Sequence, residues 1–162
     1  MTYVAESTTR INELGAVASV VSEFKRLTVD DQLAALWYVY LDLGRAITPA
    51  APGAARLHLA EGLLNQIKTA SHDQQLEMMR DLAAGRNTPF TRGYGVLSAN
   101  TKLAFWYQLA EWMGGPVVPM PAGYRPAGVV SVLLSRLREL TFNQQITALR
   151  QMVVDMGVDP LA

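Results

Sequence analysis

The sequence predicts an all-α protein built from two similar halves. Two segments recur in the same order: DQLAALWYVYLDLG from Asp31 returns as NTKLAFWYQLAEWM from Asn100, and DQQLEMMRDL from Asp73 returns as NQQITALRQM from Asn143. The first pair aligns at an offset of 69 positions and the second at 70, and no segment has the pattern of a strand. Because a half of about 70 residues buries its apolar faces poorly alone, we expect the halves to pack against each other.

The recurring aromatic segment has the residue spacing of a helix. Its first copy places Leu33, Leu36, Trp37, Tyr40 and Leu41 at the i, i+3, i+4, i+7, i+8 spacing of one helical face. Large rings at this spacing usually form core, since they bury the most area. The 69-residue alignment superimposes a Trp-Tyr pair in each copy, which leaves a second explanation open, an apolar cavity lined by rings.

The N-terminal half reads as an arm and four helical segments. Residues 1–10 should form an extended arm, and a helix is predicted for 11–27. We place the boundary between the arm and the domain inside this helix, between residues 15 and 16. Thr28 starts the aromatic helix, and its spacing to Asp31 resembles a capping box. This helix ends near Gly44, and TPAAPG at 48–53 forms a turn. A helix follows over 54–69, and Ser71 with Gln74 has capping-box spacing for a helix to about 84.

The C-terminal half repeats this plan after a connector at 85–95. Ser98 or Asn100 caps the second aromatic helix, which stops at GGP, 114–116. The loop up to residue 128 is rich in Pro yet apolar, so we expect it to cover something. Helices over 129–140 and from Thr141 to about 156 complete the domain, with Thr141 and Gln144 in a third capping-box spacing.

Composition excludes several classes of protein. Half of the 162 residues are hydrophobic and only 17% are charged, which indicates a large interior or an apolar surface meant for a ligand. Fourteen basic and 14 acidic residues are spread evenly, so no nucleic-acid footprint is visible. With no run of 18 apolar residues, no Cys and no signal-peptide pattern, we expect a cytoplasmic protein.

No constellation of residues favours an enzyme. Ser71, His72 and Asp73 are consecutive at a helix start, where side chains do not face one another, so capping explains them better than a catalytic triad. No metal-ligand spacing and no phosphate-binding glycine pattern occurs. Asp42 and Glu111 are related by the 69-residue offset and could form a carboxylate pair, although solvated acids are far commoner.

Two arginines, Arg80 and Arg150, occupy repeat-related positions after apolar stretches. Each is either exposed or turned inward, and an inward guanidinium requires a partner or an aromatic face.

Five motifs in chain order carry a resemblance to a known family: DQLAALWYVYLDLG, APGAARLHLAE, KLAFWYQL, PMPAGY and NQQITALRQMVVDMG. Over about residues 20–158 the chain resembles the N-terminal domain of the cyanobacterial orange carotenoid protein. The resemblance implies two discontinuous four-helix bundles that enclose a ligand tunnel, with residues 16–162 as a single carotenoid-binding domain. It also implies a keto-carotenoid cofactor, such as canthaxanthin or echinenone.

Carried over motif by motif, the resemblance implies a set of carotenoid-binding residues and no catalytic or metal site. They are Leu33, Leu36, Trp37, Tyr40, Met79, Leu103, Trp106, Tyr107, Met113, Met120, Pro121, Tyr124, Ile146, Arg150, Val153 and Met156. Tyr38 and Trp112 are not assigned to the pigment.

The resemblance implies a photoprotective protein that quenches singlet oxygen. The photoswitching members of the family carry a light-sensing C-terminal domain, which we do not expect here. The alternatives are an excitation-energy quencher that docks on the phycobilisome at the thylakoid surface, or a carotenoid carrier. Gly85 before Arg86, and the altered loop at 114–116, depart from the switching members of the family and weigh against docking. Expected partners are the carotenoid, the phycobilisome or a carrier similar to the C-terminal domain, with the chain a monomer or weak homodimer.

Overall fold

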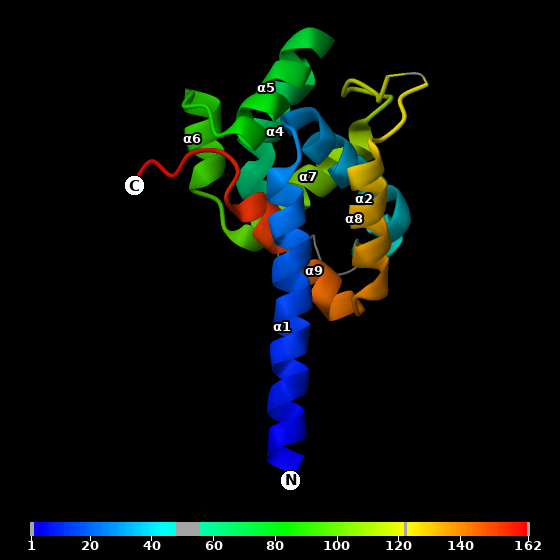
Figure 1. The fold of residues 1–162 in the computed structure, drawn as a ribbon. Coiled ribbons are helices and arrows are strands. Elements are labelled where there is room, and N and C mark those ends of the chain that lie inside the picture. The colour runs from blue at the N-terminus through cyan, green and yellow to red at the C-terminus, as the bar shows by residue number, and fades with distance from the viewer. Residues whose placement is uncertain (1, 48–55, 122, 162) are drawn as a thin grey trace.

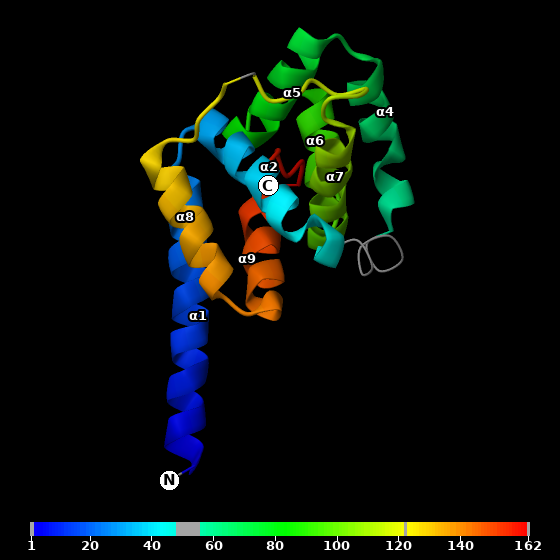
Figure 2. The ribbon, with the colours of Figure 1, turned by 90° about the vertical axis from the view of Figure 1, so that its right-hand side faces the viewer.

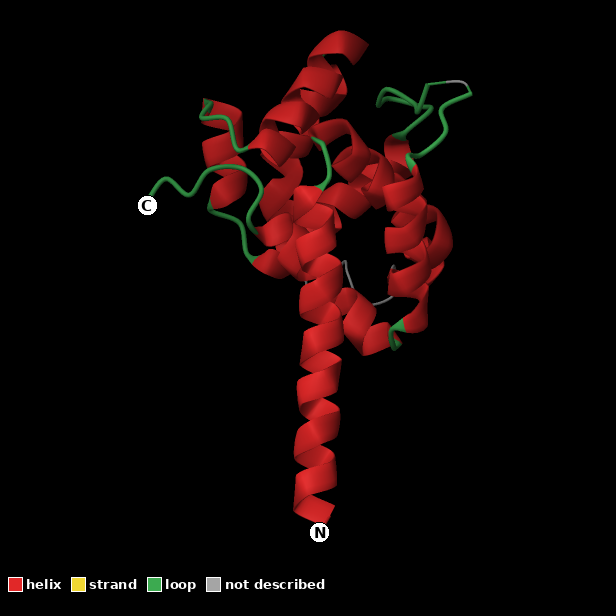
Figure 3. Cartoon of the chain, in the orientation of Figure 1, coloured by secondary structure: helices red, strands yellow, loops and turns green. Residues whose placement is uncertain are grey.

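Helices make up nearly all of the regular structure in the computed structural model, which describes residues 2–47, 56–121 and 123–161, with side chains described outside 2–13 and 44–47 (Figures 1 and 3). Within these ranges the chain forms no strand, only an isolated bridge between Met113 and Val117. The predicted all-α class is confirmed. The elements are α1 (Thr2–Arg26), α2 (Val29–Ile47), the 3-10 helix η1 (Leu57–Ala60), α4 (Glu61–Thr69), α5 (His72–Ala84), α6 (Pro89–Gly95), α7 (Ala99–Trp112), α8 (Gly128–Glu139) and α9 (Phe142–Val154).

Side-chain caps fix where the repeated helices begin. The Ser71 and Thr141 hydroxyls accept from the N–H groups of Gln74 and Gln144, and each Gln side chain accepts from the cap residue's own N–H. These two of the three predicted capping boxes are therefore confirmed. At the third, the Thr28 hydroxyl accepts from the Asp31 N–H at 3.2 Å. Ser98, one of the two predicted candidates, caps α7 through the Thr101 N–H at 3.2 Å.

The backbone repeats every 70 residues throughout, including the aromatic helices. The turn before α2, closed by Leu27 N–H to the Phe24 carbonyl, recurs before α7 between Leu97 and Tyr94. The first helical bonds, to the Thr28 and Ser98 carbonyls, are also 70 apart. The offset of 69 is thus wrong by one residue, because matched Trp-Tyr letters dominate the sequence alignment. In the structure Trp37 corresponds to Tyr107 and Leu36 to Trp106.

The helices pack into two groups, and each half of the chain contributes helices to both groups (Figure 2). One group joins α1 and α2 from the first half to α8 and α9 from the second; the other joins α4 and α5 to α6 and, through η1, to α7. The helix contacts come in pairs that the repeat relates. The contact of α2 with α5 corresponds to that of α7 with α9, and the contact of α1 with α9 corresponds to that of α6 with α5. The molecule is therefore close to two-fold symmetric, with α2 and α7 in contact between the groups.

The N-terminal arm is helical, so the expected extended backbone for residues 1–10 is wrong for residues 2–10. Residues 2–14 hold neither Gly nor Pro, and nothing stops the helix from continuing outward. The first turns of α1 project away from the other helices in both views (Figures 1 and 2). Leu14 is 69% exposed, and burial begins at Val17 among the side chains described.

Two further boundaries differ from the prediction. The connector at 85–95 contains α6, which Thr88 caps with Pro89 in its first turn, a start signal that the Gly-rich composition obscured. The segment predicted as a helix over 54–69 is described from residue 56 onward. It begins with η1 after Arg56, whose φ of 49° is left-handed, and continues as α4. The predicted turn at 48–53 lies outside the described residues.

Candidate functional site

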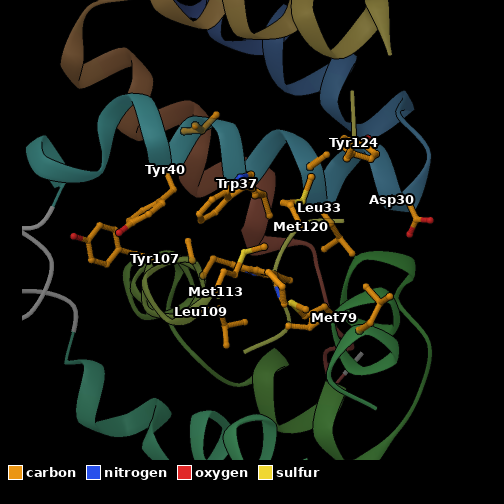
Figure 4. Close-up of a pocket in the computed structure, with 18 of the residues that line it drawn as sticks. Asp30, Leu33, Trp37, Tyr40, Met79, Tyr107, Leu109, Met113, Met120 and Tyr124 are labelled. Carbon is orange, nitrogen blue, oxygen red and sulfur yellow. The ribbon is translucent and has the colours of Figure 1, made fainter. Parts of the chain in front are cut away.

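An apolar cavity of about 200 Å³ lies where α2, α5 and α7 meet beneath the loop after α7 (Figure 4). From α2 it is lined by Leu33, Leu36, Trp37 and Tyr40, whose spacing places them on one face of the helix. The predicted apolar face of the aromatic helix therefore meets a cavity as well as the core. Figure 4 shows Tyr40 and Tyr107 at one end, Trp37 in the middle, and Asp30 with Tyr124 at the other.

Aromatic rings define the first end. Trp37 stacks on Tyr40 with ring centroids 5.6 Å apart, and Tyr40 meets Tyr107 edge to face at 5.3 Å. Burial, together with the Glu111 charge, raises the pKa of Tyr40, so its phenol stays neutral at physiological pH. These rings join α2 to α7 across the boundary between the two helix groups.

Trp106 forms part of the cavity wall and is anchored from behind. Its indole N–H donates to the Tyr94 hydroxyl at 3.0 Å, and that hydroxyl donates to the Val153 carbonyl at 2.7 Å. Tyr94 is fully buried, and burial raises the pKa of its phenol far above the usual value. This buried chain ties α7 to α6 and α9 and fixes the plane of the indole.

Gln75 holds the loop that covers the cavity. Its side-chain N–H₂ donates to the Ile67 carbonyl at 2.9 Å and to the Pro116 carbonyl at 2.7 Å, while its oxygen accepts from the Val118 N–H at 2.8 Å. The loop contributes Val118, Pro119, Met120, Pro121 and Tyr124 to the lining, as expected of an apolar Pro-rich loop. The role of Gln75 was not predicted, although its recurrence as Gln145 was the available signal.

The second end is polar. Arg80 donates to Asp30 from Nε at 2.9 Å and from Nη2 at 3.2 Å, which raises the pKa of the guanidinium further. Tyr124 donates to Asp31 at 3.2 Å, and burial followed by the Asp31 carboxylate raises the pKa of its phenol. Among the described residues, Asp30 and Arg80 are the only charged side chains that line the cavity.

All but four of the predicted carotenoid-binding residues line this cavity. The exceptions are on or just after α9. Val153 and Met156 are buried in the core, Arg150 donates to the Asn100 side chain at 3.1 Å, and Ile146 is partly buried against the core. Sequence reasoning did not assign several residues that do line it: Asp30, Ala34, Val39, Leu76, Arg80, Leu109, Ala110, Val118, Pro119 and Leu149.

The two acids that the sequence offered as a carboxylate pair have other partners in the structure. Asp42 pairs with Arg138 at 2.7 Å and Glu111 accepts from Gln108, so the considered carboxylate pair does not form. No three His, Asp or Glu side chains of the described chain gather as metal ligands. In the same part of the chain, no helix has the length and apolar character needed to span a membrane.

Helices exchanged between two repeats, around a ring-lined apolar cavity, define a class of small ligand-binding helical domain. Residues 9–159 match the family described as "Orange carotenoid protein, N-terminal", and the chain belongs to this family. The resemblance seen in the sequence is confirmed.

Individual proteins of this family are similar to the chain over most of its length. It is 56% identical to an orange carotenoid-binding domain-containing protein of Nostoc sp., with all of this chain and 99% of that protein aligned. The Red Carotenoid Protein of Anabaena (Nostoc) sp., solved with canthaxanthin, has a TM-score of 0.79 at 37% identity and covers 88% of this chain and 99% of its own. The Orange Carotenoid Protein of the same organism, also solved with canthaxanthin, has a TM-score of 0.81 at 46% identity over 90% of this chain.

Relatives differ in length. The orange carotenoid-binding protein of Synechocystis sp. is 44% identical over 87% of this chain, but the match covers only 45% of that protein. The chain therefore spans under half of this longer relative and nearly all of the Nostoc domain protein.

Proposed function

We propose that the protein binds a keto-carotenoid in the cavity between α2, α5 and α7 and protects its cell by quenching singlet oxygen. The observation that carries this proposal is the cavity itself, a ring-lined apolar space at the place where the helix groups meet. Two solved relatives of the same family bind canthaxanthin, as their descriptions state.

The lining suits a conjugated rod. A polyene is flat, apolar and polarisable, and it gains most from ring faces and from adaptable thioethers. Trp37 and Trp106 supply ring faces, and Met79, Met113 and Met120 supply the thioethers. The predicted residues that line the cavity are our proposed pigment contacts, while Ile146, Arg150, Val153 and Met156 stay predictions from the family resemblance.

Photoprotection follows from the pigment's chemistry. A long polyene accepts the excitation of singlet oxygen and releases it as heat, a step that needs no catalytic side chain. The chain's task is to keep the polyene dispersed in water and accessible to oxygen. We propose a cytoplasmic location, where such a quencher would lie beside the photosynthetic membranes.

Expression in a carotenoid-producing host tests both parts. We expect a coloured protein that removes singlet oxygen faster than its apoprotein, as followed by singlet-oxygen phosphorescence. A colourless product refutes carotenoid binding, and a coloured product no faster than the apoprotein refutes quenching.

A matched pair of variants tests the site. Trp37 lines the cavity, whereas its neighbour Tyr38 is also partly buried but does not line it. We expect Trp37→Leu to stay helical while losing pigment or shifting the absorption band, and Tyr38→Leu to keep the wild-type spectrum. If both variants keep the wild-type pigment content and spectrum, Trp37 serves only to pack the core.

The same holoprotein can be mixed with isolated phycobilisomes to test the antenna-docking alternative. Loss of phycobilisome fluorescence at low salt, where charge contacts are strongest, would favour docking over a free quencher.

A further inference from the structure

The polar end of the cavity holds a donor that the pigment-binding proposal has not used. Arg80 on α5 lines the cavity and forms a bidentate ion pair with Asp30 on α2. A guanidinium has five N–H groups, and the Asp30 carboxylate engages two of them. Among the described residues, no further partner takes the other three. The Arg80 side chain is 37% exposed, so these N–H groups meet solvent at this end of the cavity and are open to a ligand there.

The charges at this end select the kind of group that could accept from Arg80. The Arg80 guanidinium pairs with Asp30 and also feels the negative charge of Glu77, while the Tyr124 hydroxyl is committed to Asp31. An acidic ligand would meet this excess of negative charge. A neutral group that only accepts, such as a carbonyl oxygen, can take the free N–H groups without repulsion.

The other end of the cavity differs. Tyr40 and Tyr107 enclose it with rings, and none of the charged residues described lies among its lining. The repeat gives a second comparison, because Arg150 is the counterpart of Arg80 and Asn100 the counterpart of Asp30. That pair has one neutral acceptor and does not line the cavity. The near two-fold symmetry is therefore broken at the ligand.

We propose that Arg80 binds the carbonyl oxygen on a terminal ring of the carotenoid and so sets the preference for keto over non-keto pigments. The proposal rests on the proposed function, since it needs a carotenoid in this cavity. It also orients the ligand, with a keto ring at the Asp30–Arg80 end. Asp30 holds the guanidinium plane, so it acts as a positioning residue.

A competition experiment tests the selectivity. Wild-type apoprotein and Arg80→Met would be loaded from an equal mixture of canthaxanthin and β-carotene, and the bound pigments extracted and quantified. We expect the canthaxanthin-to-β-carotene ratio to fall about three- to tenfold in Arg80→Met, the range expected for one hydrogen bond to a partly exposed donor. Arg86→Met is the matched control, because Arg86 is also ion-paired on the α5 side, to Glu77 and Asp81, but does not line the cavity.

Spectra separate a direct contact from a structural effect. A donor on a carbonyl conjugated with the polyene shifts the absorption band, so Arg80→Met should move the canthaxanthin band and leave the β-carotene band in place. Arg80→Lys keeps a charged donor without the planar fork and should restore part of the ratio.

The outcomes are distinct. No pigment of any kind in the wild type refutes the proposed function. Pigment binding with equal ratios in wild type and Arg80→Met, or equal band shifts for both pigments, overturns the role of Arg80 alone. If far-UV circular dichroism shows Arg80→Met unfolded, Arg80→Lys takes its place. That variant keeps the charge but loses the planar fork, so its canthaxanthin-to-β-carotene ratio should fall below the wild-type ratio, and an unchanged ratio would contradict the proposal.

Discussion

Replacing Tyr94 by Phe should destabilise the protein strongly although only one oxygen atom is removed. That oxygen accepts from the Trp106 indole and donates to the Val153 carbonyl. Tyr94 and Val153 are both 0% exposed, so neither water nor a neighbouring polar group can substitute without rearrangement. The variant thus loses two hydrogen bonds and leaves the buried Trp106 N–H without its partner, whereas the Val153 carbonyl keeps the Met156 N–H at 3.3 Å.

The magnitude follows from one orphaned donor and one lost hydrogen bond. A buried polar group left unsatisfied costs about 1 to 3 kcal/mol and an intramolecular hydrogen bond contributes about 0.5 to 1.5 kcal/mol, so the free energy of unfolding should fall by about 1.5 to 4 kcal/mol. For a chain of this size, each kcal/mol lowers Tm by about 2 to 4 °C, which predicts a fall of about 3 to 16 °C.

Thermal and urea unfolding followed by circular dichroism would measure the change. Tyr38→Phe is the control, a partly buried tyrosine for which we expect a change within about 0.5 kcal/mol. A double-mutant cycle with Trp106→Phe should show a coupling energy, because both changes break the same bond. A loss below about 1 kcal/mol for Tyr94→Phe, or strict additivity in the cycle, would refute the reasoning.

Three other predictions concern the loop, alkaline pH and the C-terminal segment. Gln75→Leu breaks three hydrogen bonds and should cost about 2 to 4 kcal/mol, whereas Gln145→Leu breaks the bond to the Leu137 carbonyl and should cost about 1 to 2 kcal/mol in the same urea titrations. Burial raises the pKa of Tyr94 in the folded state, so the neutral phenol contributes its full stability below a pH of about 10, the pKa of a tyrosine in the unfolded chain. Above that pH, the difference in the free energy of unfolding between wild type and Tyr94→Phe should shrink. A constant difference up to a pH of about 12 would contradict this prediction. Gly95→Ala would place a Cβ 1.9 Å from the Val158 carbonyl oxygen, so it should displace that segment and cost more than about 2 kcal/mol in thermal unfolding, and a wild-type Tm would exclude this packing.

Local signals in the sequence were enough for most helix boundaries. Ser71 with Gln74 and Thr141 with Gln144 carry their capping information within four residues, and both boxes form. The cavity-lining face of α2 was visible for the same reason, since helical spacing alone places Leu33, Leu36, Trp37 and Tyr40 together.

The features that were missed depend on contacts between distant segments. Arg80 lies 50 residues from Asp30, and Tyr94 lies 59 residues from the carbonyl to which it donates. No periodicity within one helix shows which distant partner a polar side chain will meet. Alignment by letter also failed locally, because shared rings at Trp37 and Trp106 outweighed the backbone register that the helix caps define.

The exchange of helices between the two halves has a consequence for assembly. Neither the segment ending at α5 nor the segment starting at α6 contains a complete group of packed helices, since each group draws on both. A chain cut between Gly85 and Asn87 should therefore yield two pieces that fold only on mixing, with a rate that depends on concentration. The intact chain must close long loops before either group is complete, which slows folding relative to bundles joined by local hairpins. By the same geometry, a single ancestral half would have been stable only as a pair of identical copies, and joining two such copies end to end would have removed the need to find a partner.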